Sequence, residues 1–240
     1  MMLITVPIAV ALLGFARRGE KQALLMARTL GVLGIGIWVT SGVFYSIPPQ
    51  LKPEESLPIQ ACDLLALIAA VAMLRPVRLL RAVTYFGAFG LTLQAFLTPV
   101  IDTGPDTMKF YMFWLLHISI VFCAVFDVVV RGFRPTGRDL LVAVAWWAGY
   151  ALIMIGVNYP TGWYYGYLGP KIPPNAEDTI LKHLGPWPVR PLSMMALALI
   201  LFTLLWLPWA IFRPSDSGFF GFIFFWRSAG PDRQDLSDKE

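Results

Sequence analysis

The chain has 240 residues, of which 57% are hydrophobic and 14% are charged. A soluble domain carries about 25% charged residues, so this composition excludes an ordinary water-soluble domain, and it also excludes intrinsic disorder, collagen, a coiled coil and a disulfide-stapled secreted module. The net charge of +4 does not indicate nucleic-acid binding, because no basic stripe interleaved with aromatic residues lies outside the apolar runs. The composition predicts an integral membrane protein.

Seven apolar stretches approach the length of about 20 residues that a helix needs to cross a bilayer. In chain order they cover residues 1–16, 23–46, 57–74, 79–98, 110–130, 140–158 and 189–212. They predict an all-α polytopic bundle of about seven transmembrane helices, forming one domain over residues 1–213. The first stretch is followed by Arg17 and Arg18 and has no positive charge before it, which argues against a cleaved secretory signal.

Lysine and arginine alternate in number between the gaps that separate these stretches. Three gaps are rich in them, with Arg17, Arg18, Lys21, Arg75, Arg78, Arg81, Arg131, Arg134 and Arg138. The other gaps carry only Lys52, Lys109, Lys171 and Lys182. Because cytoplasmic loops carry the excess of positive charge, we expect the N-terminus outside and the C-terminus in the cytoplasm.

Three segments outside the stretches have their own predictions. The long gap at residues 159–188 is rich in aromatic residues, Gly and Pro, and predicts a lid or belt at the outer interface. Residues 214–227 form an aromatic segment that is expected to lie in the membrane interface. Residues 228–240 are polar and predict a disordered cytoplasmic tail.

Polar residues inside the apolar stretches are costly in a membrane, so each indicates function by default. A group of them lies near the predicted outer ends of four helices: Gln60, Cys62, Asp63, Gln94, His117 and Asn158, with Tyr159 beside the last. A rise of about 1.5 Å per residue puts Cys62 and Gln94 roughly 7 to 8 Å inside, and His117 roughly 10 Å inside. We therefore expect these groups to converge at one level.

A cysteine and a histidine at matching depth are the minimum pair for nucleophilic acyl chemistry, because the thiolate attacks and a base must take its proton. We assign these catalytic roles to Cys62 and His117. The amides of Gln60, Gln94 and Asn158 are candidates for donating to an oxyanion, and Tyr159 for positioning the substrate. Asp63 either orients His117 or bonds a neighbouring helix.

Simpler interpretations remain open for each residue. A cysteine in a membrane helix often only packs, which is our interpretation of Cys123, and His117 alone would also suit a structural donor between helices. Asp127 is expected to pair with Arg131, four residues later. We expect neither a metal nor another cofactor, because Cys62, His117 and Asp63 lack a second strong metal ligand.

Several short motifs resemble the YwaF-type integral membrane proteins, which are related to the transmembrane protein 164 acyltransferase. They are LPIQACDL at 57–64, LQAFLTP at 93–99, GFRPT at 132–136, NY at 158–159 and LGPWP at 184–188, together with His117. The resemblance runs from about residue 57 to residue 208. It implies a six- or seven-helix membrane protein in which the cysteine of the Cys-Asp pair carries an acyl group and a histidine assists, here Cys62 and His117. The family often has His where this chain has Gln60.

The leading hypothesis is a phospholipid acyltransferase that uses a thioester intermediate, with a membrane phospholipid or lysophospholipid as substrate. A lipid esterase in which water accepts the acyl group is an alternative, and so is a non-enzymatic small-molecule transporter or binding protein. We expect the chain in the bacterial inner (plasma) membrane, and the sequence leaves the oligomeric state open.

Overall fold

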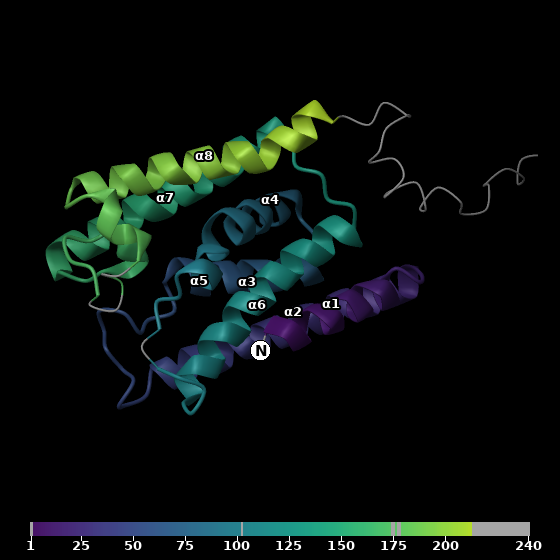
Figure 1. The fold of residues 1–240 in the computed structure, drawn as a ribbon, viewed down its shortest axis with the longest axis horizontal. Coiled ribbons are helices and arrows are strands. Elements are labelled where there is room, and N and C mark those ends of the chain that lie inside the picture. The colour runs from purple at the N-terminus through teal and green to yellow at the C-terminus, as the bar shows by residue number, and fades with distance from the viewer. Residues whose placement is uncertain (1, 102, 174–175, 177–178, 213–240) are drawn as a thin grey trace, which may run out of the picture.

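The computed structural model describes residues 2–101, 103–173, 176 and 179–212 (Figure 1). Helices are the only regular secondary structure in these ranges, which confirms the all-α prediction. The predicted aromatic segment at 214–227 and the predicted tail at 228–240 lie outside the described residues. The helices are α1 (Met2–Ala16), α2 (Glu20–Tyr45), α3 (Ala61–Leu74), α4 (Arg78–Gly87), the π-helical η1 (Ala88–Thr92), α5 (Gln94–Leu97), α6 (Met108–Val129), α7 (Gly137–Thr161), and α8 (Val189–Ile211), with short 3₁₀ turns η2 (Tyr165–Tyr167) and η4 (Ile180–Leu184).

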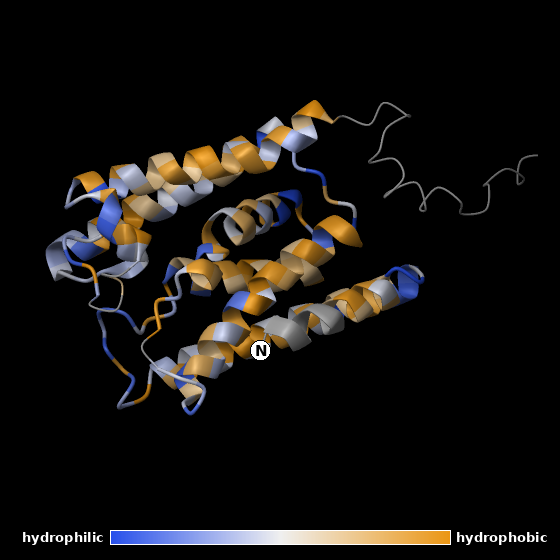
Figure 2. Cartoon of the chain, in the orientation of Figure 1, coloured by the Kyte–Doolittle hydropathy of each residue, from blue (hydrophilic) through white to orange (hydrophobic). Residues whose placement is uncertain are grey.

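Five helices of the described chain are long and apolar enough to cross a membrane: α2, the continuous run Arg78–Leu97, α6, α7 and α8. The other two predicted spans correspond to α1, with 15 residues, and α3, with 14. At about 1.5 Å per residue they are roughly 21 to 23 Å long, which is shorter than the hydrocarbon core of about 30 Å. Apolar residues cover the helices and hydrophilic residues gather at their ends, as an integral membrane protein requires (Figure 2).

The connections between helices gather at two opposite ends of the bundle (Figure 1). Residues 17–19, 75–77 and 130–136 lie at the end that we call the arginine end, on the right in the figure. The described residues of the other connections, 46–60, 98–101, 103–107, 162–173 and 179–188, lie at the other end, which we call the cavity end. The three gaps richest in Lys and Arg therefore share one end of the molecule.

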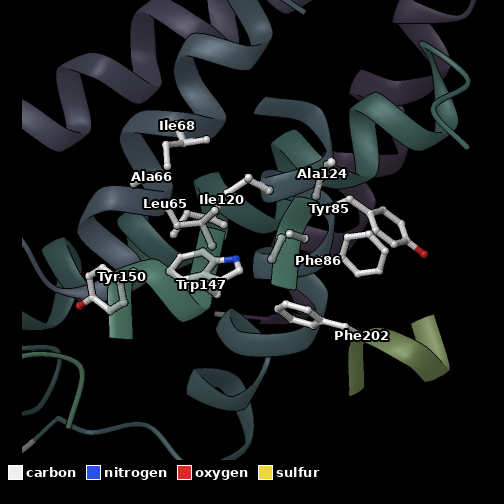
Figure 3. Packing of buried hydrophobic residues seen from close by; sticks show 14 of the residues in the cluster. Leu65, Ala66, Ile68, Tyr85, Phe86, Ile120, Ala124, Trp147, Tyr150 and Phe202 are labelled. Atoms are coloured by element: carbon white, nitrogen blue, oxygen red, sulfur yellow. The ribbon is translucent and has the colours of Figure 1, made fainter. Parts of the chain in front are cut away.

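Close helix packing builds the core between these ends. Gly31 and Gly34 of α2 lie against α3 so closely that a Cβ atom on Gly34 would stand 2.8 Å from the Cβ of Ala70. Small residues that let helix backbones approach are the usual basis of packing in membranes. The main buried cluster unites five helices, through Leu65, Phe86, Ile120, Trp147 and Phe202 among others (Figure 3).

Ion pairs at the arginine end differ from the predicted local pair. Asp127, 3% exposed, accepts from the Nε of Arg81 at 3.1 and 2.8 Å, whereas Arg131 stands 4.0 Å away. Arg131 instead donates to the carbonyls of Ala72 and Met73 at the end of α3. The partner predicted from spacing alone is thus secondary, because packing of α4 against α6 brings a better-placed guanidinium to the same carboxylate.

A second pair at this end joins α4 to α7. Arg78 donates to both carboxylate oxygens of Asp139, at 2.9 and 2.7 Å. Asp139 also accepts from the backbone N–H of Thr136, whose hydroxyl caps the first turn of α7. The Phe133 ring lies under both guanidiniums, with the Arg81 carbon 4.7 Å from its centroid. These contacts fix the relative positions of the helices that reach the cavity end.

Candidate active site

A cavity of about 560 Å³ opens at the cavity end between α3, η1, α5, α6, α7, α8 and the 162–188 connection. This volume lies in the range of roughly 300 to 1,000 Å³ that is typical of small-molecule sites. Five of the residues singled out from the sequence line it: Gln60, Cys62, Asp63, Gln94 and His117. They come from three separate segments of the chain, so the expected convergence is present for these five.

The segment before Cys62 forms a turn, although the sequence predicted a helix from residue 57. The backbone N–H of Leu57 donates to the Tyr165 hydroxyl at 3.1 Å, and the Ile59 carbonyl accepts from the Tyr150 hydroxyl at 3.0 Å. These bonds take backbone groups that a helix would use, and α3 begins only at Ala61. Cys62 is therefore in the first turn, where unpaired N–H groups and the helix dipole favour negative charge.

Polar groups surround the half-buried Cys62. The Thr92 hydroxyl lies beside the thiol, at the end of the π-helical turn, and the Asp63 carboxyl lies next to it. The phenols of Tyr150 and Tyr167 are close enough to interact electrostatically with its sulfur. Apolar surroundings and a neighbouring carboxylate oppose a thiolate, so this nucleophile needs a base.

His117 presents an unused nitrogen. Its Nδ1 lies 2.7 Å from the carbonyl oxygen of Phe113. A carbonyl only accepts, so Nδ1 carries the proton, and Nε2 of the neutral ring keeps its lone pair. No described residue bonds Nε2. The ring packs against Phe113, with centroids 4.2 Å apart, so its orientation is fixed. His117 thus offers a base on the wall of the cavity that Cys62 also lines.

The two lining amides differ in how they are held. Gln60 accepts from the backbone N–H of Gly166 at 2.8 Å through Oε1, and no described residue takes a hydrogen bond from its Nε2. Gln94 donates from Nε2 to the Gly90 carbonyl of its own helical segment at 3.3 Å. Gln60 is therefore fixed at its acceptor end with its donor end unengaged, as an oxyanion donor requires.

Asn158 and Tyr159, also singled out from the sequence, do not line the cavity. Asn158 is fully buried and bonds the backbone of Tyr165 twice, through Nδ2 to its carbonyl at 2.7 Å and through Oδ1 from its N–H at 3.0 Å. Tyr159 is 66% exposed and stacks on Trp187. The depth estimate from the sequence placed Asn158 and Tyr159 near the cavity end of α7. It could not show in which direction their side chains point around the helix.

The sequence analysis missed polar residues near Cys62, among them Thr92 beside the thiol and Tyr150 and Tyr167 in the cavity lining. Thr92 and Tyr150 look like ordinary helix residues, and only the π-helical turn and the turn at residues 57–60 bring them to Cys62. Tyr167 lies in the connection that the sequence predicted as a lid or belt. That connection packs inward as a wall of the cavity, with Tyr165 fully buried. Its aromatic density is the one signal in the sequence that pointed to it.

Cys123 lies in a separate apolar cluster with Met26 and Phe126 and is 2% exposed. It is buried but distant from the cavity lining, so it serves as an internal comparison for Cys62. Across the described residues, no three His, Cys, Asp or Glu side chains are grouped so that they could hold a metal ion.

Comparison with known proteins gives one match. No curated protein and no solved structure matches the chain. The sequence profile of the TMEM164 family matches residues 1–206, which span every described helix except the last five residues of α8. With its apolar helices and this match over most of its length, the chain is an integral membrane protein that belongs to the TMEM164 family.

Proposed function

We propose that the protein is a membrane lipid acyltransferase that moves an acyl chain between phospholipids through a thioester on Cys62, with His117 as the base. One observation carries this proposal: a cysteine in the first turn of α3 and a histidine with an unused Nε2 line the same cavity. Covalent acyl transfer needs a nucleophile and a base that takes its proton, and these two residues offer both in one cavity.

The reaction has two halves. Nε2 of His117 accepts the thiol proton, the sulfur of Cys62 bonds to the ester carbonyl carbon, and the carbonyl electron pair moves to oxygen, where the Nε2 of Gln60 donates to it. Collapse of this intermediate breaks the bond to the glycerol oxygen, which takes the proton from His117. A lysophospholipid hydroxyl then reverses the same steps and leaves with the acyl chain.

The composition of the wall suits an acyl chain. Apolar side chains of α8 and η1 face the cavity opposite the polar group at Cys62, among them Leu91, Met194, Leu199 and Phe202. Leu199 is also 50% exposed on the outer surface of the bundle, so an acyl chain in this part of the cavity lies next to the bilayer.

The same proposal includes the topology. We propose that α1 and α3 join the five longer helices as spans, with local thinning of the bilayer compensating for their length. The arginine end then faces the cytoplasm and the cavity end faces outward, in a bacterial inner membrane. A site in the outer half is remote from cytosolic acyl-CoA, so the acyl donor is a phospholipid.

The test is to supply membranes containing the protein with a phospholipid that bears an alkyne-tagged acyl chain, and to look for a hydroxylamine-sensitive label on the protein. We expect Cys62→Ser and His117→Ala to lose the label, and Cys123→Ser to keep it. The buried Cys123 controls for nonspecific acylation of a membrane thiol. Absence of label on folded wild-type protein contradicts the proposal and favours a binding or transport protein.

Varying the lysophospholipid separates transfer from hydrolysis. Transfer predicts that tagged diacyl product rises with lysophospholipid at the expense of free fatty acid. A rate of fatty acid release that does not change with lysophospholipid concentration identifies an esterase. Loss of function on substitution of Gln94, with Cys62→Ser still active, identifies a binding protein.

A further inference from the structure

Tyr167 has a backbone conformation that side chains rarely adopt. Its φ is 61°, and it is the one non-glycine residue with positive φ in the part of the chain that the structure describes. Gly166 before it has φ 62°, so two consecutive residues are left-handed. A bulky aromatic residue in this region is strained, and such strain persists where the surroundings impose it and clusters at functional sites.

Three polar side chains, one from α7, one from the turn before α3 and one from α8, impose this conformation. Asn158 of α7 bonds both backbone groups of Tyr165, Gln60 before α3 accepts from the N–H of Gly166, and Arg190 of α8 donates from Nε to the carbonyl of Tyr167 at 3.1 Å. Three consecutive residues are thus each held by a side chain from a different part of the fold.

Arg190 adds a further constraint after the turn. It is 5% exposed and donates from its NH2 group to the carbonyls of Gly169 and Lys171. A buried guanidinium that bonds three successive parts of one connection holds that connection to α8. The backbone of Tyr167 therefore has no freedom to relax, and its side chain direction is determined by the fold.

The side chain shares the cavity with the reacting group. Tyr167 lines the cavity together with Cys62, and its phenol interacts electrostatically with the Cys62 thiol and the Asp63 carboxyl. No described residue forms a hydrogen bond with its hydroxyl. Burial, with Cys62, Glu55 and Asp63 nearby, raises the pKa of Tyr167 well above its usual value, so the phenol keeps its proton at neutral pH. A protonated hydroxyl without a partner is a donor ready for a ligand.

We infer that Tyr167 is a further catalytic residue, which donates its hydroxyl hydrogen bond to the oxyanion that forms when Cys62 attacks the acyl ester. This inference rests on the proposed function. The phenol keeps its proton throughout: the bond between sulfur and carbon forms, the carbonyl electron pair moves to oxygen, and the hydroxyl of Tyr167 and the amide of Gln60 donate to that oxygen. The strained turn serves to direct this donor before the substrate binds.

The first experiment measures the rate of Cys62 acylation in Tyr167→Phe, which removes the hydroxyl and keeps the ring. Loss of one oxyanion donor slows the chemical step by about 10²- to 10³-fold, so we expect kcat to fall by that factor with little change in KM. Tyr111→Phe is the control, because Tyr111 is an exposed α6 tyrosine that lies outside the cavity. An unchanged acylation rate in Tyr167→Phe overturns the inference.

A second measurement separates catalysis from a structural role. A trifluoromethyl ketone analogue of the phospholipid ester forms a tetrahedral adduct with a cysteine, and the adduct carries the oxyanion, whereas the matching ether lipid does not react. Tyr167→Phe should weaken binding of the ketone by about the same factor as it lowers kcat, and it should leave binding of the ether lipid unchanged. Equal weakening of both ligands identifies a structural role and overturns the inference.

The two proposals fail in different ways. If the wild-type protein forms no thioester on Cys62, the proposed function fails and Tyr167 has no oxyanion to bind. If the thioester forms and depends on His117 while Tyr167→Phe acylates at the wild-type rate, the proposed function stands and the role of Tyr167 is wrong.

Discussion

The two ends of the bundle use polar residues in opposite ways. At the arginine end, the carboxylates of Asp127 and Asp139 are each bonded by a guanidinium, and Arg131 closes the end of α3. At the cavity end, His117 and Tyr167 each have a polar atom that no described residue bonds. The first arrangement pairs its carboxylates with guanidinium groups inside the protein, and the second leaves polar atoms for a ligand.

This contrast separates stability from chemistry in space. Removing one partner of a buried ion pair leaves an uncompensated charge, so the arginine end should respond to substitution mainly in stability. Removing a group that has no internal partner costs the fold little, so the cavity end should respond mainly in activity. The substitutions below test whether that division is real.

The largest expected effect on stability is at Asp127. Asp127→Asn leaves Arg81 and Arg131 with no charged partner from this residue, and breaking a buried ion pair on one side costs about 3 to 5 kcal/mol. The matched change is Asp63→Asn at the cavity end, because Asp63 forms no ion pair with the described residues. The Asp63→Asn variant should therefore unfold at a temperature close to that of the wild type. Thermal unfolding in detergent compares the two. Equal destabilisation by both variants contradicts the division between the ends.

Gln60→Glu isolates the donor end of one side chain. The glutamate keeps an oxygen for the Gly166 N–H but has no Nε2 to donate to an oxyanion. We expect acylation to slow by about 10²- to 10³-fold, equivalent to about 3 to 4 kcal/mol, with a small change in stability. A fall in the unfolding midpoint as large as that of Asp127→Asn would show that Gln60 acts mainly on the fold.

Asn158→Ala should change stability and activity together. Both backbone groups of Tyr165 lose a buried partner, which we expect to cost about 2 to 3 kcal/mol. Acyl transfer falls in the same variant, because the strained turn at Tyr167 loses one of its three anchors. A catalytic loss without destabilisation would show instead that Asn158 touches the substrate, as its depth in the sequence suggested.

The sequence was sufficient for features that depend on local composition. Apolar length, bounded by charges and prolines, placed the ends of the longer helices within a few residues of their observed positions, as at residue 189, where α8 begins. Polar residues inside apolar stretches identified five members of the cavity wall, because burying such groups in a membrane needs a reason.

Features that depend on distant partners could not be predicted. Residues 57–60 form a turn and not a helix because Tyr150 and Tyr165, about a hundred residues later, bond the backbone there. Asp127 pairs mainly with Arg81 across 46 residues, where local spacing suggested Arg131. The role of Asn158 depends on the direction of its side chain. Depth along a helix does not determine how the helix is rotated about its axis, so the sequence could not predict that direction.

The smallest expected effects come from two helix caps, one at each end. The Thr136 hydroxyl caps α7 at the arginine end, and the Thr107 hydroxyl caps α6 at the cavity end, each accepting from a backbone N–H at 3.4 Å. Replacing either threonine with alanine should lower the free energy of unfolding by about 1 kcal/mol.

The two variants should still differ in activity. Fraying of α6 loosens the helix that carries His117, so Thr107→Ala should slow acyl transfer several-fold, whereas Thr136→Ala should not, because Asp139 and Arg78 still hold the start of α7. Unfolding midpoints and transfer rates measured on the same preparations decide the matter, and an equal loss of transfer in both variants would mean that the arginine end also controls the geometry of the site.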